Sequence, residues 1–100
     1  MLRDLGAAIS PTNSFQLIQG LETLPLRFRV HQDNAQRVAE HLVKHEAILS
    51  VIYPSLFEGV QKAKADKYLN RGYGPIVGIE LKGGEAAGRK FIDNLKMIYH

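Results

Sequence analysis

The first half of the chain carries apolar residues at helical spacing. Ser10 followed by Pro11 marks a helix start, because serine suits the N-cap and a proline at the first helical position loses no needed hydrogen bond. Pro25 is expected to end or kink this helix, since proline cannot continue the intrahelical hydrogen bonding. The predicted buried face consists of Leu17, Ile18, Leu21 and Leu24, with Phe15 beside them.

A second amphipathic helix is predicted after Pro25. Its apolar stripe is Ala35, Val38, Ala39, Leu42 and Val43. Its polar side is Asp33, Arg37, Glu40 and Lys44. Separation of the two sets onto opposite faces is typical of a helix that packs one side against a core.

Beyond these helices the chain alternates between strand-like and helix-like segments. Leu49–Tyr53 is short and apolar and is closed by Pro54, which favours a strand over another helical turn. Residues 54–59 are interpreted as a loop. A helix is then expected from Val60 to Leu69. The residues that end it are Asn70, Gly72 and Gly74.

In the last quarter of the chain a strand is again expected before a helix. Ile76–Leu81 is a predicted strand with alternating faces. The side chains on one of these faces are Val77, Ile79 and Leu81. Gly83 and Gly84 turn the chain into a last helix, and Met97–Tyr99 is expected to begin a third strand. The residues at helical spacing in that last helix are Gly88, Phe91, Ile92 and Leu95.

The fold class that follows is α+β, with two N-terminal helices followed by a partial C-terminal subdomain in which helices pack on a small sheet. At 100 residues the chain is long enough for one domain. The first helix is very apolar for a chain with little to cover it. Self-association through that helix is therefore the expected partner interaction.

Composition narrows the classes of function. With no cysteine among the 100 residues, disulfides, thiolate metal sites and cysteine nucleophiles are excluded. No run approaches the roughly 18 apolar residues of a membrane helix and no signal peptide is visible, so a cytoplasmic location is expected. The net charge of +3 is modest. The basic stretch from Lys62 to Arg71 is interrupted by Asp66, so a solvated helix face explains it and no nucleic-acid partner is predicted.

Several long motifs carry a family resemblance. Residues 3–15 read RDLGAAISPTNSF, residues 20–27 read GLETLPLR, and residues 81–93 read LKGGEAAGRKFID. Shorter matches occur at 34–35, 38–39, 42, 53–54 and 67–69. Together they make the chain similar, over essentially its whole length, to the O-acetylhomoserine sulfhydrylase branch of the Cys/Met metabolism family.

This resemblance implies a fold-type-I enzyme that binds pyridoxal phosphate on a lysine and replaces the acetyl group of O-acetylhomoserine with sulfide or a thiol. It also implies that residues 1–47 are helices from the end of the large domain and the linker, and that residues 48–100 begin the small C-terminal domain. In the family the Schiff-base lysine and the phosphate ligands precede this segment, and the carboxylate-binding arginine follows it. No catalytic, cofactor-binding or metal residue is therefore expected here, and no pyridoxal phosphate is expected to bind this chain alone.

The chain departs from the family pattern at two places. Arg29 stands where the family usually has glutamate, which reverses the charge. Ser55 follows Tyr53 and Pro54 where the family commonly has glycine. The resemblance therefore does not fix the local loop geometry.

Other candidate chemistry has simpler explanations. His41 and His45 have the spacing of two metal ligands on a helix, but no third ligand is evident. Glycines 83, 84 and 88 resemble a phosphate loop, yet Glu85 would repel phosphate. Arg27 is interpreted as a structural residue that pairs at a helix junction. The lysines, all in polar contexts unlike that of a Schiff-base lysine, are Lys44, Lys62, Lys64, Lys67, Lys82, Lys90 and Lys96.

Two hypotheses remain from the sequence. The first is a fragment of a pyridoxal-phosphate sulfhydrylase of methionine and cysteine biosynthesis that is inactive alone. The second is a non-enzymatic, self-associating interaction module derived from that family.

Overall fold

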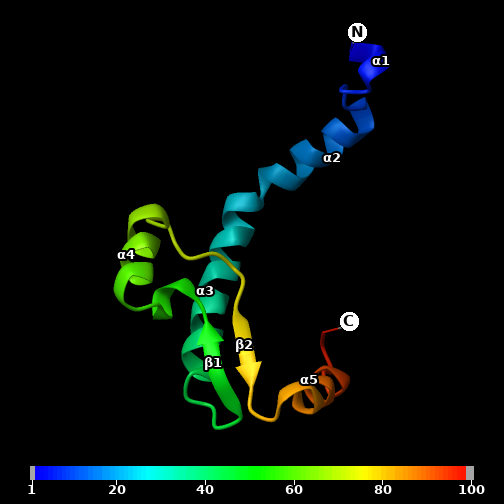
Figure 1. The fold of residues 1–100 in the computed structure, drawn as a ribbon. Coiled ribbons are helices and arrows are strands. Elements are labelled where there is room, and N and C mark those ends of the chain that lie inside the picture. Colours follow the sequence, from blue (N-terminus) through cyan, green and yellow to red (C-terminus); the bar gives the residue numbers. More distant parts are fainter. Residues whose placement is uncertain (1, 99–100) are drawn as a thin grey trace. The chain divides into compact units, whose positions relative to one another are not determined.

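The computed structural model describes residues 2–98, which contain α-helices and a small antiparallel sheet and so have α+β secondary structure (Figure 1). The helices are α1 (Leu2–Leu5), α2 (Pro11–Glu22), α3 (Leu24–Leu42), α4 (Gly59–Tyr68) and α5 (Gly84–Asp93). The strands are β1 (Ile48–Ile52) and β2 (Gly78–Leu81), and a 3-10 turn, η1, spans Pro54–Leu56. The predicted fold class is confirmed.

The chain divides into two compact units, Met1–Val30 and His31–His100. This division falls within α3. The predicted domain boundary after residue 47 concerns the family's domains and stays a prediction.

In the first unit, α2 begins as the sequence predicts. Ser10 is the N-cap, and its Oγ accepts a hydrogen bond from the backbone N–H of Asn13 at 3.2 Å. The helix ends at Glu22, before the proline. Pro25 is the second residue of α3, so its missing N–H falls in a first turn, where no intrahelical bond is needed.

The apolar side chains of α2 are exposed rather than buried. Phe15, Leu17, Ile18 and Leu21 each keep more than half of their surface accessible. None of the residues of α2, all of which the structure describes, is buried. The predicted buried face therefore exists as an apolar face without a cover among the described residues.

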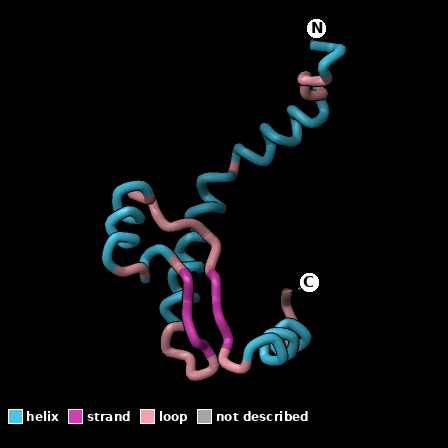
Figure 2. Tube along the Cα trace, in the orientation of Figure 1, coloured by secondary structure: helices cyan, strands magenta, loops and turns pink. Residues whose placement is uncertain are grey.

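In the second unit, β1 pairs antiparallel with β2 (Figure 2). Val51 is opposite Ile79, and both are half-buried. Ser50 is opposite Glu80 on the exposed face, where the Ser50 hydroxyl donates to Glu80 Oε2 at 3.0 Å. The predicted alternation of the second strand is confirmed, although β2 begins at Gly78 rather than at residue 76.

The core of this unit forms where α3 meets the end of β1. Ala35 and Ala39 are buried on α3, and the ring of Tyr53 lies against them with 1% of its surface exposed. Small residues at both helix positions let the large ring approach the backbone closely. The partly buried residues around them are Val51, Leu56, Tyr73 and Val77.

The predicted stripe of α3 is confirmed only in part. Ala35 and Ala39 are buried and Leu42 is partly buried. Val38 and Val43, in contrast, are exposed, with about half of their surface accessible. The Tyr53 ring packs against the two alanines, and Val38 and Val43 lie outside this core cluster.

Two further segments differ from the sequence prediction. The loop at 54–59 contains η1, because Pro54 fixes the backbone dihedral of a tight turn and the N–H of Phe57 bonds to the Pro54 carbonyl. Met97 and Ile98 are not in a strand. Of the predicted third strand, Tyr99 lies outside the described residues.

Candidate functional site

Two side chains of the second unit hold the backbone of Gly74. The hydroxyl of Tyr53 donates to the Gly74 carbonyl at 2.9 Å. The N–H of Gly74 donates to Oε1 of Gln32, on α3, at 3.1 Å. Both backbone polar groups of Gly74 are thereby bonded by side chains 21 and 42 residues away in sequence. The segment that joins α4 to β2 is thus attached to α3.

Glycine is favoured on both sides of Tyr73. Gly72 has a φ of +121°, and a Cβ built there would lie 2.3 Å from Oε1 of Gln32. Gly74 has a φ of +84°. Residues with a Cβ rarely adopt these backbone angles. Glycine at both positions therefore lets the backbone turn on either side of Tyr73 while the Gln32 side chain stays close to it.

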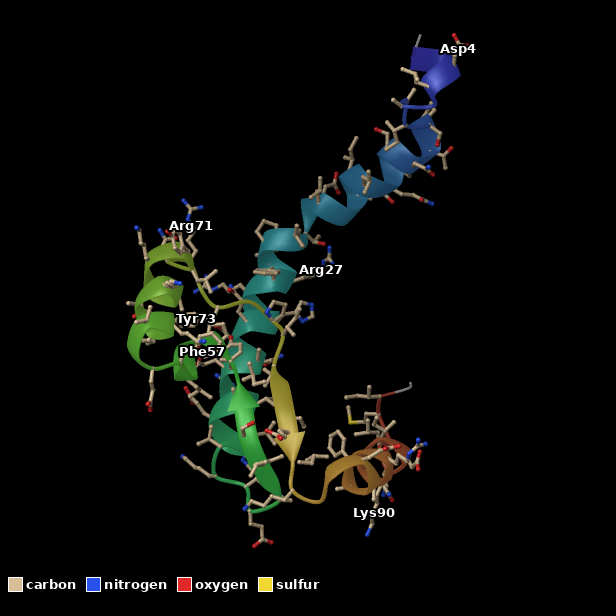
Figure 3. All side chains as sticks on the ribbon, viewed as in Figure 1. Asp4, Arg27, Phe57, Arg71, Tyr73 and Lys90 are labelled. Carbon is tan, nitrogen blue, oxygen red and sulfur yellow. The ribbon has the colours of Figure 1, made fainter. Side chains whose placement is uncertain are left out.

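Tyr73 connects the core to α4. Its ring meets that of Tyr53 edge to face, with centroids 6.2 Å apart at 72°. Its hydroxyl donates to Oδ1 of Asp66 at 2.9 Å, and the Lys62 ammonium donates to the same hydroxyl at 2.9 Å and to Asp66 at 2.6 Å. Figure 3 labels Tyr73 between α4 and α3, with Arg71 at the end of α4.

These contacts shift the acidity of three groups. Hydrogen bonds from Lys62 and then Tyr73 hold the pKa of Asp66 below its ordinary value of 3.8. The hydrogen bond to Asp66, followed by that to Tyr73, raises the pKa of Lys62 above 10.5. Burial, and then the charge of Tyr73, raise the pKa of Tyr53 above 10.0.

The direction of each shift fixes its pH window. The contribution of Asp66 to stability is present above pH 3.8 and is lost as the pH falls through its lowered pKa in the folded chain. The contribution of Lys62 is present below pH 10.5 and is lost as the pH rises through its raised pKa. The contribution of Tyr53 is likewise present below pH 10.0 and is lost as the pH rises through its raised pKa in the folded chain.

The chemistry of this cluster is positional. Lys62 is held protonated by Asp66, so it is no nucleophile at neutral pH. The buried Tyr53 hydroxyl is committed to a backbone carbonyl. The cluster fixes backbone, and it offers no activated base or acid to a substrate.

Two shallow apolar grooves lie elsewhere in the second unit. One, of about 290 Å³, is formed by α5 and the end of β2. Its lining residues are Ala47, Leu81, Lys82, Ala87, Lys90, Phe91 and Asn94. The other, of about 360 Å³, lies along α4. Its lining residues are Phe57, Gln61, Lys64, Ala65, Tyr68 and Leu69. Neither groove contains a carboxylate.

The candidate metal pair of the sequence does not share a helix face. His41 lies in the last turn of α3, but the helix ends at Leu42 and His45 lies in the turn that follows. Nδ1 of His45 accepts the N–H of Ala47 at 3.2 Å. Among residues 2–98, no group of three or more histidine and acidic side chains is placed to hold a metal ion.

The glycine turn and the arginine have structural roles. Gly83 and Gly84 adopt φ of +99° and +61° where β2 turns into α5, and Glu85 in the first turn of α5 pairs with Arg89 at 2.7 Å. Arg27 bridges α2 and α3 within the first unit. Its guanidinium donates to Thr23 Oγ1 at 3.1 Å and to the Gly20 carbonyl at 2.6 Å, which agrees with the structural interpretation of this residue.

Sequence reasoning missed the cluster around Gly74. Two glycines that flank an aromatic residue are a signal for positive φ on both sides of a packed ring. That signal was available at Gly72 and Gly74, although nothing in the sequence pairs them with Gln32. The sequence also does not predict that the Oγ of Ser55 is buried without a hydrogen-bond partner among the described residues.

Comparison with known proteins gives a consistent family. The model of the Cys/Met metabolism PLP-dependent enzyme family matches residues 1–100. An O-acetyl-L-homoserine sulfhydrylase of Leptospira meyeri is 54% identical over 97 residues, which are 96% of this chain and 22% of the relative. A homocysteine synthase of Schizosaccharomyces pombe is 43% identical over 96 residues and is likewise covered to 22%.

Solved structures agree with the sequence comparisons. A cystathionine gamma synthase of Xanthomonas oryzae pv. oryzae, in complex with aminoacrylate and cysteine, matches 97% of this chain with a TM-score of 0.85 at 39% identity. A putative O-acetylhomoserine (thiol)-lyase of Campylobacter jejuni matches 99% with a TM-score of 0.85 at 36% identity. This chain covers 25% and 24% of those two chains, so it spans about a quarter of their length. In residues 2–98 no helix is both long and apolar enough to cross a membrane.

Proposed function

The chain belongs to the Cys/Met metabolism PLP-dependent enzyme family, and from this premise we propose that it is one segment of a longer sulfhydrylase. That enzyme makes homocysteine or its thioether from O-acetylhomoserine and sulfide or a thiol, in the cytoplasm. The observation that supports the proposal most is the 54% identity to an O-acetyl-L-homoserine sulfhydrylase, which extends over 96% of the chain.

We infer that this chain alone does not bind pyridoxal phosphate, and three features of the described residues support this inference. A Schiff-base lysine needs a lowered pKa, whereas Asp66 raises the pKa of Lys62. The start of α5 presents the Glu85 carboxylate, which opposes a phosphate. The groove bordered by Lys82 and Lys90 has no acidic residue to pair with the pyridinium nitrogen. We therefore place the residues that hold the cofactor and the substrate outside this chain.

The proposal is tested first by the size of the native protein. An antibody raised against this chain should detect, in cell extracts, a band about four to five times heavier than 11.2 kDa, because the chain spans 22% of the Leptospira meyeri sulfhydrylase. That protein, purified with the antibody, should form homocysteine from O-acetylhomoserine and sulfide. A native band of 11.2 kDa, or a large protein without this activity, would contradict the proposal.

A second experiment tests the division of the site. The purified 100-residue chain, incubated with pyridoxal phosphate and then borohydride, should show no internal-aldimine absorbance and no single modified lysine in its peptide map. One lysine modified in stoichiometric yield would overturn the placement of the cofactor site outside this chain.

The exposed face of α2 favours a second candidate, a non-enzymatic module that self-associates. Phe15, Leu17, Ile18 and Leu21 together present an apolar surface that water does not favour. We propose that a second copy of the chain covers it in solution. The purified chain should then scatter light as a dimer or larger assembly, and Ile18→Ser should shift it toward the monomer. A monodisperse wild-type monomer would remove this candidate.

The two candidates are distinguishable. A large native protein with sulfhydrylase activity supports the first whatever the isolated chain does. A native 11.2 kDa chain that dimerises supports the second.

A further inference from the structure

The segment between α4 and β2 is held at two points of different chemical character. Near its middle, Gly74 is bound by Tyr53 and Gln32. One residue earlier, Tyr73 is bound by Asp66 and Lys62 of α4. Residues 69–77 are called the strap below.

The attachment at Gly74, the inner latch, uses neutral groups. The Tyr53 side chain is 1% exposed, and it bonds to a backbone carbonyl. The Gln32 amide is partly buried and bonds to a backbone N–H. Hydrogen bonds between neutral groups in a low-dielectric setting do not respond to dissolved salt.

The attachment at Tyr73, the outer latch, depends on charge and is open to solvent. The Asp66 side chain is 52% exposed and that of Lys62 is 35% exposed. The Lys62 ammonium also lies 5.0 Å from the centre of the Tyr73 ring. Ion pairs of this exposure are weakened by salt.

We propose that the strap opens in two steps, with Tyr73 leaving α4 first while Gly74 stays attached to α3. Gly72 and Gly74, both at positive φ, lack a Cβ, so the backbone can rotate on both sides of Tyr73 with little steric restriction. Because Tyr73 and Val77 pack against the core of Ala35, Ala39 and Tyr53, the first step uncovers one edge of that core. Loss of the charged contacts of the outer latch thus permits a local opening. The hydrogen bonds of the inner latch hold Gly74 in place, so that the opening is reversible.

Nuclear magnetic resonance on the purified chain separates the two latches. The amide exchange of Gly74 reports the inner latch, since that N–H is the donor to Gln32. The ring signals of Tyr73 report the outer latch. In the wild type, raising sodium chloride to about 1 M should shift the Tyr73 ring signals and leave Gly74 exchange within about two-fold, because the Debye length falls to roughly 3 Å.

Two variants should respond in opposite ways. Tyr53→Phe keeps the ring but removes the hydroxyl, so Gly74 exchange should rise by about five-fold, which is the loss of one ordinary hydrogen bond. Asp66→Asn keeps the size of the side chain but removes the charge. It should leave Gly74 exchange within about two-fold and abolish the salt response of Tyr73.

Matched variants guard the result. Gln32→Ala tests the inner latch from its other side and should raise Gly74 exchange like Tyr53→Phe. Ser50→Ala removes a hydrogen bond from the exposed sheet face, away from the strap, and should change neither readout. If Asp66→Asn raises Gly74 exchange as much as Tyr53→Phe does, or if Tyr73 shows no salt response in the wild type, the strap has a single latch and the proposal fails.

Discussion

The two units of the chain are ordered by different kinds of contact. In the first, the hydrogen bonds are local: Ser10 caps α2 three residues away, and Arg27 reaches back seven residues to Gly20. In the second, side chains bridge residues that are 21, 30 and 42 positions apart. The first unit therefore has secondary structure without a core of its own among its described residues, and the second has a small core.

Because of this difference, we expect substitutions in the second unit to lower stability more than substitutions in the first. A helix whose apolar side chains face solvent loses little when one of them is removed, because burial that is absent cannot be lost. A core of few residues loses much when its one large ring is removed.

The largest effect is expected for Tyr53→Ala. Tyr53 is the largest fully buried side chain of the described residues, and its removal leaves a cavity and an unpaired Gly74 carbonyl. We expect the free energy of unfolding of the second unit to fall by about 3–5 kcal/mol. Urea unfolding followed by circular dichroism measures this loss.

Phe15→Ala is the matched control in the first unit. Phe15 is 59% exposed, so the free energy of unfolding should change by no more than about 0.5 kcal/mol. The comparison breaks if Phe15→Ala costs as much as Tyr53→Ala, because α2 would then have a buried face in solution.

A smaller loss is expected for Gly72→Ala. The new Cβ must adopt a φ of +121° and displace the end of the Gln32 side chain, which would also free the Gly74 N–H. We expect a loss of about 2 kcal/mol in the free energy of unfolding. Thermal unfolding in parallel with Gly74 amide exchange measures both consequences.

Gly20→Ala is the opposite case. Gly20 lies inside α2, and a Cβ there meets no other atom within 4 Å. Alanine should therefore stabilise the helix by about 1 kcal/mol, since glycine costs conformational entropy in a helix. A destabilising Gly20→Ala would show that something packs on that position in solution.

The sequence predicts the local features of both units and few of the tertiary ones. The helix start at Ser10 and Pro11 and the alternation of β2 depend on neighbouring residues, and both are confirmed. The contact of Gln32 with Gly74 joins residues 42 positions apart, and no periodicity encodes such a pair. The third strand was predicted from an apolar run alone, and Met97 and Ile98 do not form one.

A local effect is expected for Ser10→Ala. The Ser10 hydroxyl satisfies the N–H of Asn13, and its loss should cost α2 about 1 kcal/mol. Because the contact lies wholly in the first unit, backbone chemical shifts should show fraying of residues 11–14 and leave Gly74 exchange unchanged. Matching losses in both units would mean that they unfold as one, which contradicts the comparison.

The smallest effect is a gain in stability and concerns Ser55. Its Oγ is buried without a hydrogen-bond partner among the described residues, so Ser55→Ala removes a desolvated polar atom and keeps the Cβ. We expect a gain of up to about 1 kcal/mol, the low end of the roughly 1–3 kcal/mol that an unpaired buried polar group costs, because the Ser55 residue as a whole is only half-buried. Ser50→Ala, which removes a hydroxyl that does bond to Glu80, should instead cost up to about 0.5 kcal/mol. Urea midpoints of the two variants moving in opposite directions would show that the second unit tolerates an unpaired hydroxyl at η1. A loss for Ser55→Ala would mean that this hydroxyl has a partner in solution.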